Sequence, residues 1–159
     1  MKFEEILRAL RDSNVDFIIV GGVAARIHGA ARLTDDLDVV YGRSRENIER
    51  LARALAPFHP YLRGAPPGLP FRFDPSTIRG GLNFTLVTDA GPLDCLGEIS
   101  GVGGYEAIAS RSEPVEVFGV ACRVIDLDAL ILAKRAAGRP KDFEALAELE
   151  AIREEKSEE

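Results

Sequence analysis

The chain has 159 residues and is 46% hydrophobic and 29% charged, which predicts one globular domain over residues 1–159 with a substantial core. Its formal net charge of −6 argues against passive binding to a nucleic-acid backbone, although a local basic groove stays compatible with it. No apolar run approaches the roughly 20 residues of a membrane span, and the acidic, amphipathic N-terminal segment does not resemble a signal peptide. We therefore expect a cytoplasmic protein that does not enter a membrane.

The first forty residues alternate between helical and extended patterns. Apolar residues three and four positions apart predict an amphipathic helix over residues 2–12, and the apolar, partly β-branched run 16–20 predicts a short buried strand. The glycine pair at 21–22 can adopt backbone angles that other residues resist, so it predicts a tight turn. A helix over 23–28 and a second strand over 36–41 are expected to follow.

The middle of the chain contains a helix, a proline-rich segment and two strands. Ser44 is a suitable N-cap for a helix that carries an apolar stripe as far as Leu55. Six of the nine prolines then fall between residues 57 and 75, so this segment is expected to be largely loop or flap. The alternating pattern over 82–87 and the run 93–96 predict two strands, which pair most simply as a hairpin.

The C-terminal third combines a strand or hairpin over 115–124 with two helices. Asp126 can cap the first helix, and Pro140 opens the second. We therefore expect C-terminal helices over about 126–155 and a charged, disordered tail over 154–159. Together these elements predict an α/β (α+β) fold, in which a small mixed sheet is flanked by helices.

Two acidic residues stand out in the second predicted strand. Side chains alternate along a strand, so Asp36 and Asp38 face one side of the sheet and the apolar residues beside them face the other. Neighbouring carboxylates repel each other, and a bound divalent cation is a good physical reason to tolerate them. Asp94, on a later predicted strand, can complete such a site.

The glycine turn offers the second half of a site. Free backbone N–H groups at Gly21-Gly22, and the start of the helix that follows, can hold a phosphate. Carboxylates that hold magnesium can in turn bind a triphosphate, because the metal offsets charge on the leaving pyrophosphate. If the glycine turn, the Asp36/Asp38 pair and Asp94 meet in one place, the sequence predicts a nucleotide site.

Taken in order, three motifs resemble the polymerase-beta-type nucleotidyltransferase superfamily. They are Val20-Gly21-Gly22, then Asp36-Leu37-Asp38-Val39, then Leu93-Asp94-Cys95. The thirteen residues between Gly22 and Asp36 are at the long end of the spacing in that superfamily. The wider context is similar to small stand-alone bacterial members, including the AbiEii-type nucleotidyltransferase toxins. The segments that carry this finer resemblance are His28-Gly29, Arg32-Leu33-Thr34-Asp35 and residues 134–142.

The resemblance implies a metal-dependent enzyme. It would move a nucleoside monophosphate from a nucleoside triphosphate to a hydroxyl acceptor and release pyrophosphate. The acceptor could be a protein side chain, a tRNA end or a small molecule, and the sequence shows no recognisable acceptor-binding domain that would decide between them. An antitoxin is a further partner that the resemblance implies.

The resemblance also assigns roles to individual residues. The catalytic residues, which would also be the ligands of two magnesium ions, are Asp36, Asp38 and Asp94. The residues that would bind the nucleotide are Gly21, Gly22, Thr34 and Lys134. Further cations that could neutralise phosphate charge are Arg139 and Lys141.

Each of these features also has a plain structural interpretation. The glycine pair could be an ordinary turn, the acidic pair could form ion pairs with Arg26 and Arg32, and Asp94 could be a surface carboxylate. Lys134 could be a solvated helix residue. His28 could be hydrogen-bonded at a helix end instead of touching a base or a phosphate.

Two further functions compete with the enzyme. A binding module could keep the fold without turnover, for example as half of a toxin–antitoxin pair, but such a module has no need of all three carboxylates. A magnesium-dependent phosphohydrolase ranks last, because the sequence shows no metal-binding histidine cluster and no obvious nucleophile. Cys95 and Cys122 lack metal-ligand spacing and are expected to be buried free thiols.

Overall fold

Seven strands form one mixed sheet in the computed structural model, which describes residues 2–158. The strand order is β3-β4-β5-β2-β1-β9-β8. The strands of this sheet are β1 (Phe17–Val20), β2 (Leu37–Tyr41), β3 (Tyr61–Leu62), β4 (Phe84–Thr88), β5 (Gly91–Leu96), β8 (Ser112–Val117) and β9 (Val120–Ile125). A separate two-stranded sheet joins β6 (Glu98–Ile99) and β7 (Gly103–Gly104).

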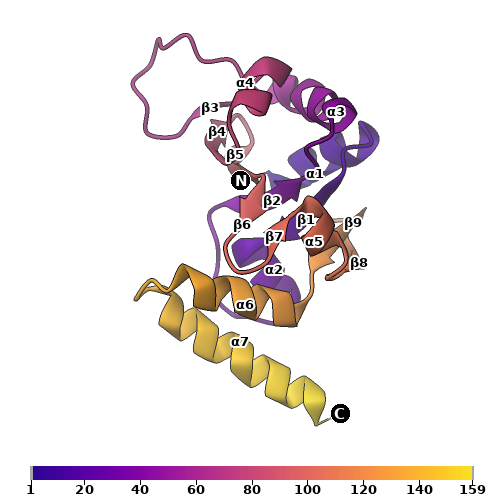
Figure 1. Ribbon diagram of the computed structural model, residues 1–159, viewed down its shortest axis with the longest axis vertical. Helices are drawn as coiled ribbons and strands as arrows, with labels where there is room; N and C mark the ends of the chain where they lie inside the picture. The colour runs from indigo at the N-terminus through magenta and orange to yellow at the C-terminus, as the bar shows by residue number, and fades with distance from the viewer. Residues whose placement is uncertain (1, 159) are drawn as a thin grey trace.

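Helices lie around the sheet and at both ends of the molecule (Figure 1). They are α1 (Phe3–Asp12), α2 (Gly21–Ile27), α3 (Arg45–Leu55), the 3-10 helix η1 (Ala56–Phe58), α4 (Pro75–Gly80), α5 (Tyr105–Ala109), α6 (Leu127–Ala137) and α7 (Asp142–Ser157). Figure 1 shows α6 and α7 side by side at one end and α3 and α4 at the opposite end.

The centre of the sheet mixes parallel and antiparallel pairing. Strand β2 lies antiparallel to β1 and parallel to β5, and β1 lies parallel to β9. The expected hairpin of β4 and β5 lies on one side of this centre, and the hairpin of β8 and β9 lies on the other. The prediction of a mixed sheet flanked by helices is therefore confirmed.

One face of β2 and β5 is packed into the core, which fixes the direction of the opposite face. The core residues that these two strands contribute on that face have no exposed surface, and they are Leu37, Val39, Leu93 and Cys95. Because the side-chain period of a strand is two, Asp38 and Asp94 point to the other face. Burial of each large apolar side chain contributes about 1.5–3 kcal/mol, so the register of the two strands is strongly specified.

Two helices begin at positions that differ from the sequence prediction. Helix α2 starts at Gly21, directly after β1, so the glycine pair forms its first turn rather than a separate loop. Helix α7 starts at Asp142 rather than at Pro140. The reason is that Gly138 ends α6 in the left-handed conformation, with φ of 61°, and Pro140 lies in the short connection that follows.

The C-terminal helices cover nearly the range that the sequence predicts. Asp126 caps α6 by accepting a hydrogen bond from the N–H of Ala129 at 2.7 Å. Helix α7 runs to Ser157, whereas the sequence predicts disorder from residue 154, and fraying of this last turn in solution stays a prediction. Within residues 2–158, no helix is both long and apolar enough to cross a membrane.

The proline-rich segment is largely loop, as the sequence predicts. Its one short strand, β3, pairs antiparallel with β4 at the edge of the sheet. The backbone N–H of Arg63, the first residue after β3, donates to the carbonyl of Thr85 at 3.0 Å. The chain then forms the long loop that projects from the body of the molecule between β3 and α4 (Figure 1).

A buried asparagine joins two ends of the central strands. Asn47 on α3 has no exposed surface. Its side-chain nitrogen donates to the carbonyls of Gly42 at 2.7 Å and Asp16 at 3.1 Å, and its side-chain oxygen accepts from the N–H of Asp16 at 2.6 Å. Asn47 thus satisfies backbone groups where the chain enters β1 and where it leaves β2.

Asn47→Ala should lower the free energy of unfolding by about 2–4 kcal/mol, because it leaves the buried carbonyl of Gly42 and the part-buried N–H of Asp16 without their partner. Urea denaturation followed by circular dichroism measures the change. Arg53→Ala, an exposed position on the same helix, is the control and should change the value by less than about 0.5 kcal/mol. Similar values for the two variants would contradict the role given to Asn47.

Candidate active site

Three carboxylates meet at the centre of the sheet. Asp38 on β2 and Asp94 on β5 are direct partners in the parallel pair, and Asp36 lies immediately before β2. One side-chain oxygen of each residue lies within 4.8 Å of the other two. The sequence prediction that Asp94 lies beside Asp36 and Asp38 is therefore confirmed.

The backbone of the glycine pair packs closely against this cluster, at positions where a side chain would not fit. Gly21 has φ of +66°, and a Cβ atom at this position would collide with the carboxylate of Asp38. A Cβ atom on Gly22 would lie 2.7 Å from the Oγ1 of Thr34. The pair therefore allows the start of α2 to approach both the acidic cluster and the loop that leads into β2.

Thr34 fixes the position of the first carboxylate through the backbone. Its hydroxyl donates to the carbonyl of Asp36 at 3.1 Å and accepts from the N–H of Asp36 at 3.3 Å. The same loop is attached to α7, because the N–H of Ala31 donates to Glu148 at 3.1 Å. Thr34 can therefore support the site, because its hydroxyl is hydrogen-bonded to the backbone of Asp36 and not to the carboxylate.

A side chain that the sequence analysis did not single out contacts two of the three carboxylates. The Nη2 of Arg63 lies 2.8 Å from the Oδ1 of Asp94, and its Nη1 lies 3.6 Å from the Oδ2 of Asp36. The same Nη2 donates to the carbonyl of Leu86 at 2.7 Å. The guanidinium group therefore lies across the open edge of the acidic cluster and neutralises part of its charge.

The arginines that the sequence offered as partners of the acidic pair bond elsewhere. Arg26 donates to the carbonyl of Ala31 at 2.9 Å, and Arg32 forms an ion pair with Glu144 on α7 at 3.3 Å. That alternative is therefore wrong. The arginine that does contact the cluster is Arg63, which comes from a distant part of the chain.

Asp38 is a largely buried carboxylate whose pKa is raised by its surroundings. Burial, together with the charge of Asp94 and a hydrogen bond shared with it, raises the pKa of Asp38 from 3.8 to about 7. The charge of Asp36 adds to this rise in the pKa, and the charge of Lys134 opposes it. The Oδ1 of Asp38 is also buried without a hydrogen-bond partner within residues 2–158. Such an atom is unfavourable unless a proton or a cation satisfies it.

A buried carboxylate holds two cations beside the acidic cluster. Asp142, whose side chain is 4% exposed, lies 3.2 Å from the Nζ of Lys134 and 2.8 Å from the Nε of Arg139. The hydrogen bond from Arg139 comes first among the causes that lower the pKa of Asp142. The ion pairs of Asp142 join the end of α6 to the start of α7. They also hold Lys134 where its charge opposes the rise in the pKa of Asp38.

Two adjoining clefts, of about 270 and 280 Å³, share Asp38, Lys134 and Arg139. Gly22 and Thr34 line the first, together with the cations Arg32 and Lys141 and the carboxylate of Asp36. The second is bounded by Gly21 and by apolar side chains of β5, β6 and α6, namely Leu96, Ile99, Leu130 and Ala133. The glycine pair and the acidic pair therefore face the same cavity system.

The remaining candidates take structural positions. His28 is buried and its Nε2 is hydrogen-bonded to the carbonyl of Ile125 at 2.7 Å, so it is the helix-end histidine of the plain interpretation. Cys95 is a buried free thiol, whereas Cys122 is a free thiol that is half-buried.

Sequence reasoning missed two residues of the site. Asp142 was within the segment 134–142 that carried the resemblance, and its spacing from Lys134 could have indicated an ion pair between successive helices. Arg63 had no comparable signal, because it lies in the proline-rich segment and reaches the carboxylates through the pairing of β3 with β4.

The chain was compared with known proteins at the levels of sequence and structure. No protein-family model matches it, and no curated protein matches it in sequence. Solved structures do match. A Thermotoga maritima protein described as a nucleotidyltransferase, TM1012, has 16% identity and a TM-score of 0.60, over 91% of this chain and 88% of that one. ANT(2")-Ia, solved in complex with adenylyl-2"-tobramycin, has 17% identity and a TM-score of 0.59, over 92% of this chain and 84% of that one.

A nucleotidyltransferase-like protein from Paracoccidioides brasiliensis has 13% identity and a TM-score of 0.57, over 96% of this chain and 77% of that one. The chain has a nucleotidyltransferase fold. At these identities the likeness is one of fold, and it leaves the finer resemblance to AbiEii-type toxins a prediction. Within this fold Asp36 and Asp38, the glycine pair, and the cations at the junction of α6 and α7 line one cavity system, and Asp94 lies beside the two aspartates.

Asp38→Asn should stabilise the metal-free protein at pH 8, and by a smaller amount at pH 5. The folded chain keeps a proton on Asp38 up to about pH 7, because its pKa is raised to about 7 from the value of 3.8 that applies when unfolded. Between these values the folded state binds more protons than the unfolded state, so stability falls as the pH rises. The loss is complete above about pH 7 and is on the order of 4 kcal/mol.

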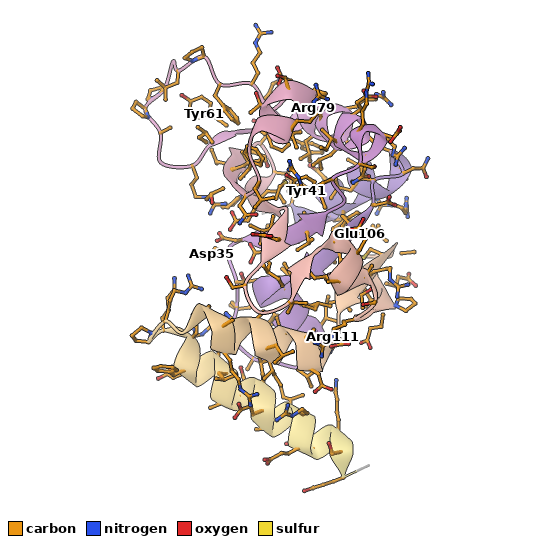
Figure 2. All side chains as sticks on the ribbon, viewed as in Figure 1. Asp35, Tyr41, Tyr61, Arg79, Glu106 and Arg111 are labelled. Carbon is orange, nitrogen blue, oxygen red and sulfur yellow. The ribbon has the colours of Figure 1, made fainter. Side chains whose placement is uncertain are left out.

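Urea denaturation in the presence of a chelator, at both pH values, measures this effect. Asp35→Asn is the control, because Asp35 is the exposed neighbour of the acidic pair (Figure 2). It should change stability by the same small amount at both pH values. A stabilisation by Asp38→Asn that does not grow between pH 5 and pH 8 would contradict the raised pKa.

Proposed function

We propose that the chain is a metal-dependent nucleotidyltransferase, which moves a nucleoside monophosphate from a nucleoside triphosphate to a hydroxyl acceptor. The observation that carries the proposal is the convergence of Asp36, Asp38 and Asp94, of which the first two line a cavity system that a glycine pair and a group of cations also line. The nucleotidyltransferase fold supports the same reaction class.

The residues present fit a divalent cation. Carboxylate oxygens are the ligands that magnesium prefers, and Asp36, Asp38 and Asp94 offer one oxygen each within 4.8 Å of one another. The buried Oδ1 of Asp38 also has no partner within residues 2–158. Magnesium bound there, as one or two ions, would lower the pKa of the acceptor hydroxyl and offset charge on the leaving pyrophosphate.

In the proposed reaction the acceptor oxygen forms a bond to the α-phosphorus of the triphosphate, and the bond from that phosphorus to the bridging oxygen breaks. Pyrophosphate leaves with the electron pair of that bond. Asp94 is proposed to take the proton of the acceptor hydroxyl, since its carboxylate is directly beside Asp38 and 22% exposed. Lys134 and Arg139, with Lys141, would hold the phosphates, and Gly22 would let them approach the backbone.

Asp38→Ala should lower nucleotidyl transfer at least about a hundredfold, because it removes the central carboxylate of the cluster. The assay follows label from each of four α-labelled triphosphates, with magnesium, into a cell lysate, and measures pyrophosphate release in parallel. The labelled product also identifies the acceptor class. Tobramycin is one small-molecule acceptor to include, since ANT(2")-Ia was solved with its adenylylated form.

Asp35→Ala is the matched control and should leave transfer unchanged, because Asp35 is exposed and lies outside both clefts. Equal activity of wild type and Asp38→Ala would contradict the mechanism. Triphosphate binding by calorimetry without pyrophosphate release, under all acceptor conditions, would instead support the non-catalytic binding module, such as a partner of an antitoxin.

Asp142→Asn should weaken triphosphate binding about tenfold or more, because Lys134 and Arg139 lose the charge that holds them beside the cleft. Calorimetry with a non-hydrolysable triphosphate measures this loss, and thermal unfolding checks that the variant is folded. Glu150→Gln is the control, because it removes a carboxylate of α7 that pairs with Arg135 of α6 outside both clefts. Equal losses in the two variants would contradict the role given to Asp142.

A further inference from the structure

Arg63 is bound where a divalent cation would be expected. Its guanidinium group contacts Asp94 at 2.8 Å and Asp36 at 3.6 Å, which are two of the three carboxylates of the cluster. A guanidinium group and a metal ion are both cations that bind carboxylate oxygens. They cannot share the lone pairs of one oxygen at full strength, so the two compete wherever they meet the same carboxylates.

The hydrogen-bond donors of the Arg63 side chain are only partly satisfied. Its Nη2 has good partners in Asp94 and the carbonyl of Leu86, but its Nε is buried without a partner within residues 2–158. Asp38, the third carboxylate, receives no hydrogen bond at its Oδ1. Arg63 thus neutralises the charge of the cluster incompletely. Its buried Nε–H has no hydrogen-bond partner within residues 2–158, which lowers the stability of this arrangement.

The chain around Arg63 is suited to release the side chain. Backbone pairing holds the residue at the sheet edge, through the N–H of Arg63 and the carbonyl of Thr85 at 3.0 Å. Gly64 follows immediately, with φ of +81° and no atom within 4 Å of where its Cβ would be. The side chain is 29% exposed, so it can turn toward solvent while its backbone stays paired.

We propose that Arg63 is an internal counter-cation, which competes with the divalent metal ion for Asp36 and Asp94. Metal binding then requires that the guanidinium group leave these carboxylates. The charges are consistent with this exchange, since one guanidinium group offsets one of the three carboxylate charges, whereas one divalent ion in its place offsets two. The inference rests on the proposed function only in that the acidic cluster is taken as the metal site.

The experiment measures the affinity of the protein for Mn²⁺ alone, by electron paramagnetic resonance of the free ion, without any nucleotide. Arg63→Ala should bind Mn²⁺ at least about tenfold more tightly than wild type. Arg63→Lys keeps a charge but loses the planar fork, so it should give an intermediate affinity. Arg72→Ala, which removes an exposed arginine of the same loop, should match wild type.

Guanidinium chloride at non-denaturing millimolar concentration distinguishes direct competition from a general change in charge. In Arg63→Ala the free guanidinium ion should weaken Mn²⁺ binding more than the same concentration of sodium chloride does. In wild type the two salts should act alike. Circular dichroism confirms that each variant is folded. Unchanged or weaker Mn²⁺ binding in Arg63→Ala and Arg63→Lys, or equal effects of the two salts in Arg63→Ala, would overturn the proposal.

Asp38→Ala separates failure of the inference from failure of the proposed function. If Asp38→Ala removes Mn²⁺ binding while Arg63→Ala equals wild type, the metal site stands and only the role of Arg63 falls. If Mn²⁺ binds equally well to wild type and Asp38→Ala, or to neither, the acidic cluster is not the metal site and both fall. If Arg63→Ala binds Mn²⁺ more tightly but the wild-type protein transfers nucleotide to no acceptor, the inference is supported and the proposed enzymatic function is contradicted.

Discussion

The in-register parallel pairing of β2 with β5 is the constraint on which the site depends. It places Asp38 directly beside Asp94, and a shift of one residue would set Asp38 beside a core residue instead. The register is specified on the opposite face of the sheet, where apolar side chains of the two strands pack into the core. The polar face of the sheet is therefore arranged in part by interactions on its apolar face.

Crowding three carboxylates opposes folding, and the surrounding residues limit that effect unequally. Arg63 contacts Asp36 and Asp94 directly, whereas Lys134 acts on Asp38 only as a nearby charge. The least compensated carboxylate is thus Asp38, whose Oδ1 is buried without a hydrogen-bond partner within residues 2–158. Sites that bind charged ligands commonly retain such unfavourable groups, because removing them would stabilise the fold and abolish the binding.

The sequence predicted those parts of the site that local patterns determine. Strand alternation gave the common face of Asp36 and Asp38, and the glycine pair marked the close approach of α2. The contacts of Arg63 could not be predicted, because they depend on a two-residue strand inside a proline-rich segment with little pattern of its own. The start of α7 was misplaced because Pro140, a common first residue of helices, lies here in a connection, and Asp142 begins the helix.

The two sides of the cleft carry opposite charge and come from different parts of the chain. The sheet supplies the acidic side, and Lys134, Arg139 and Lys141, around the junction of α6 and α7, supply the basic side. A free metal ion is repelled by the basic side, and a free polyphosphate is repelled by the acidic side. A ligand that is itself positive at one end and negative at the other matches both. The charge distribution of the cleft is therefore complementary to that of a metal chelate of a phosphate.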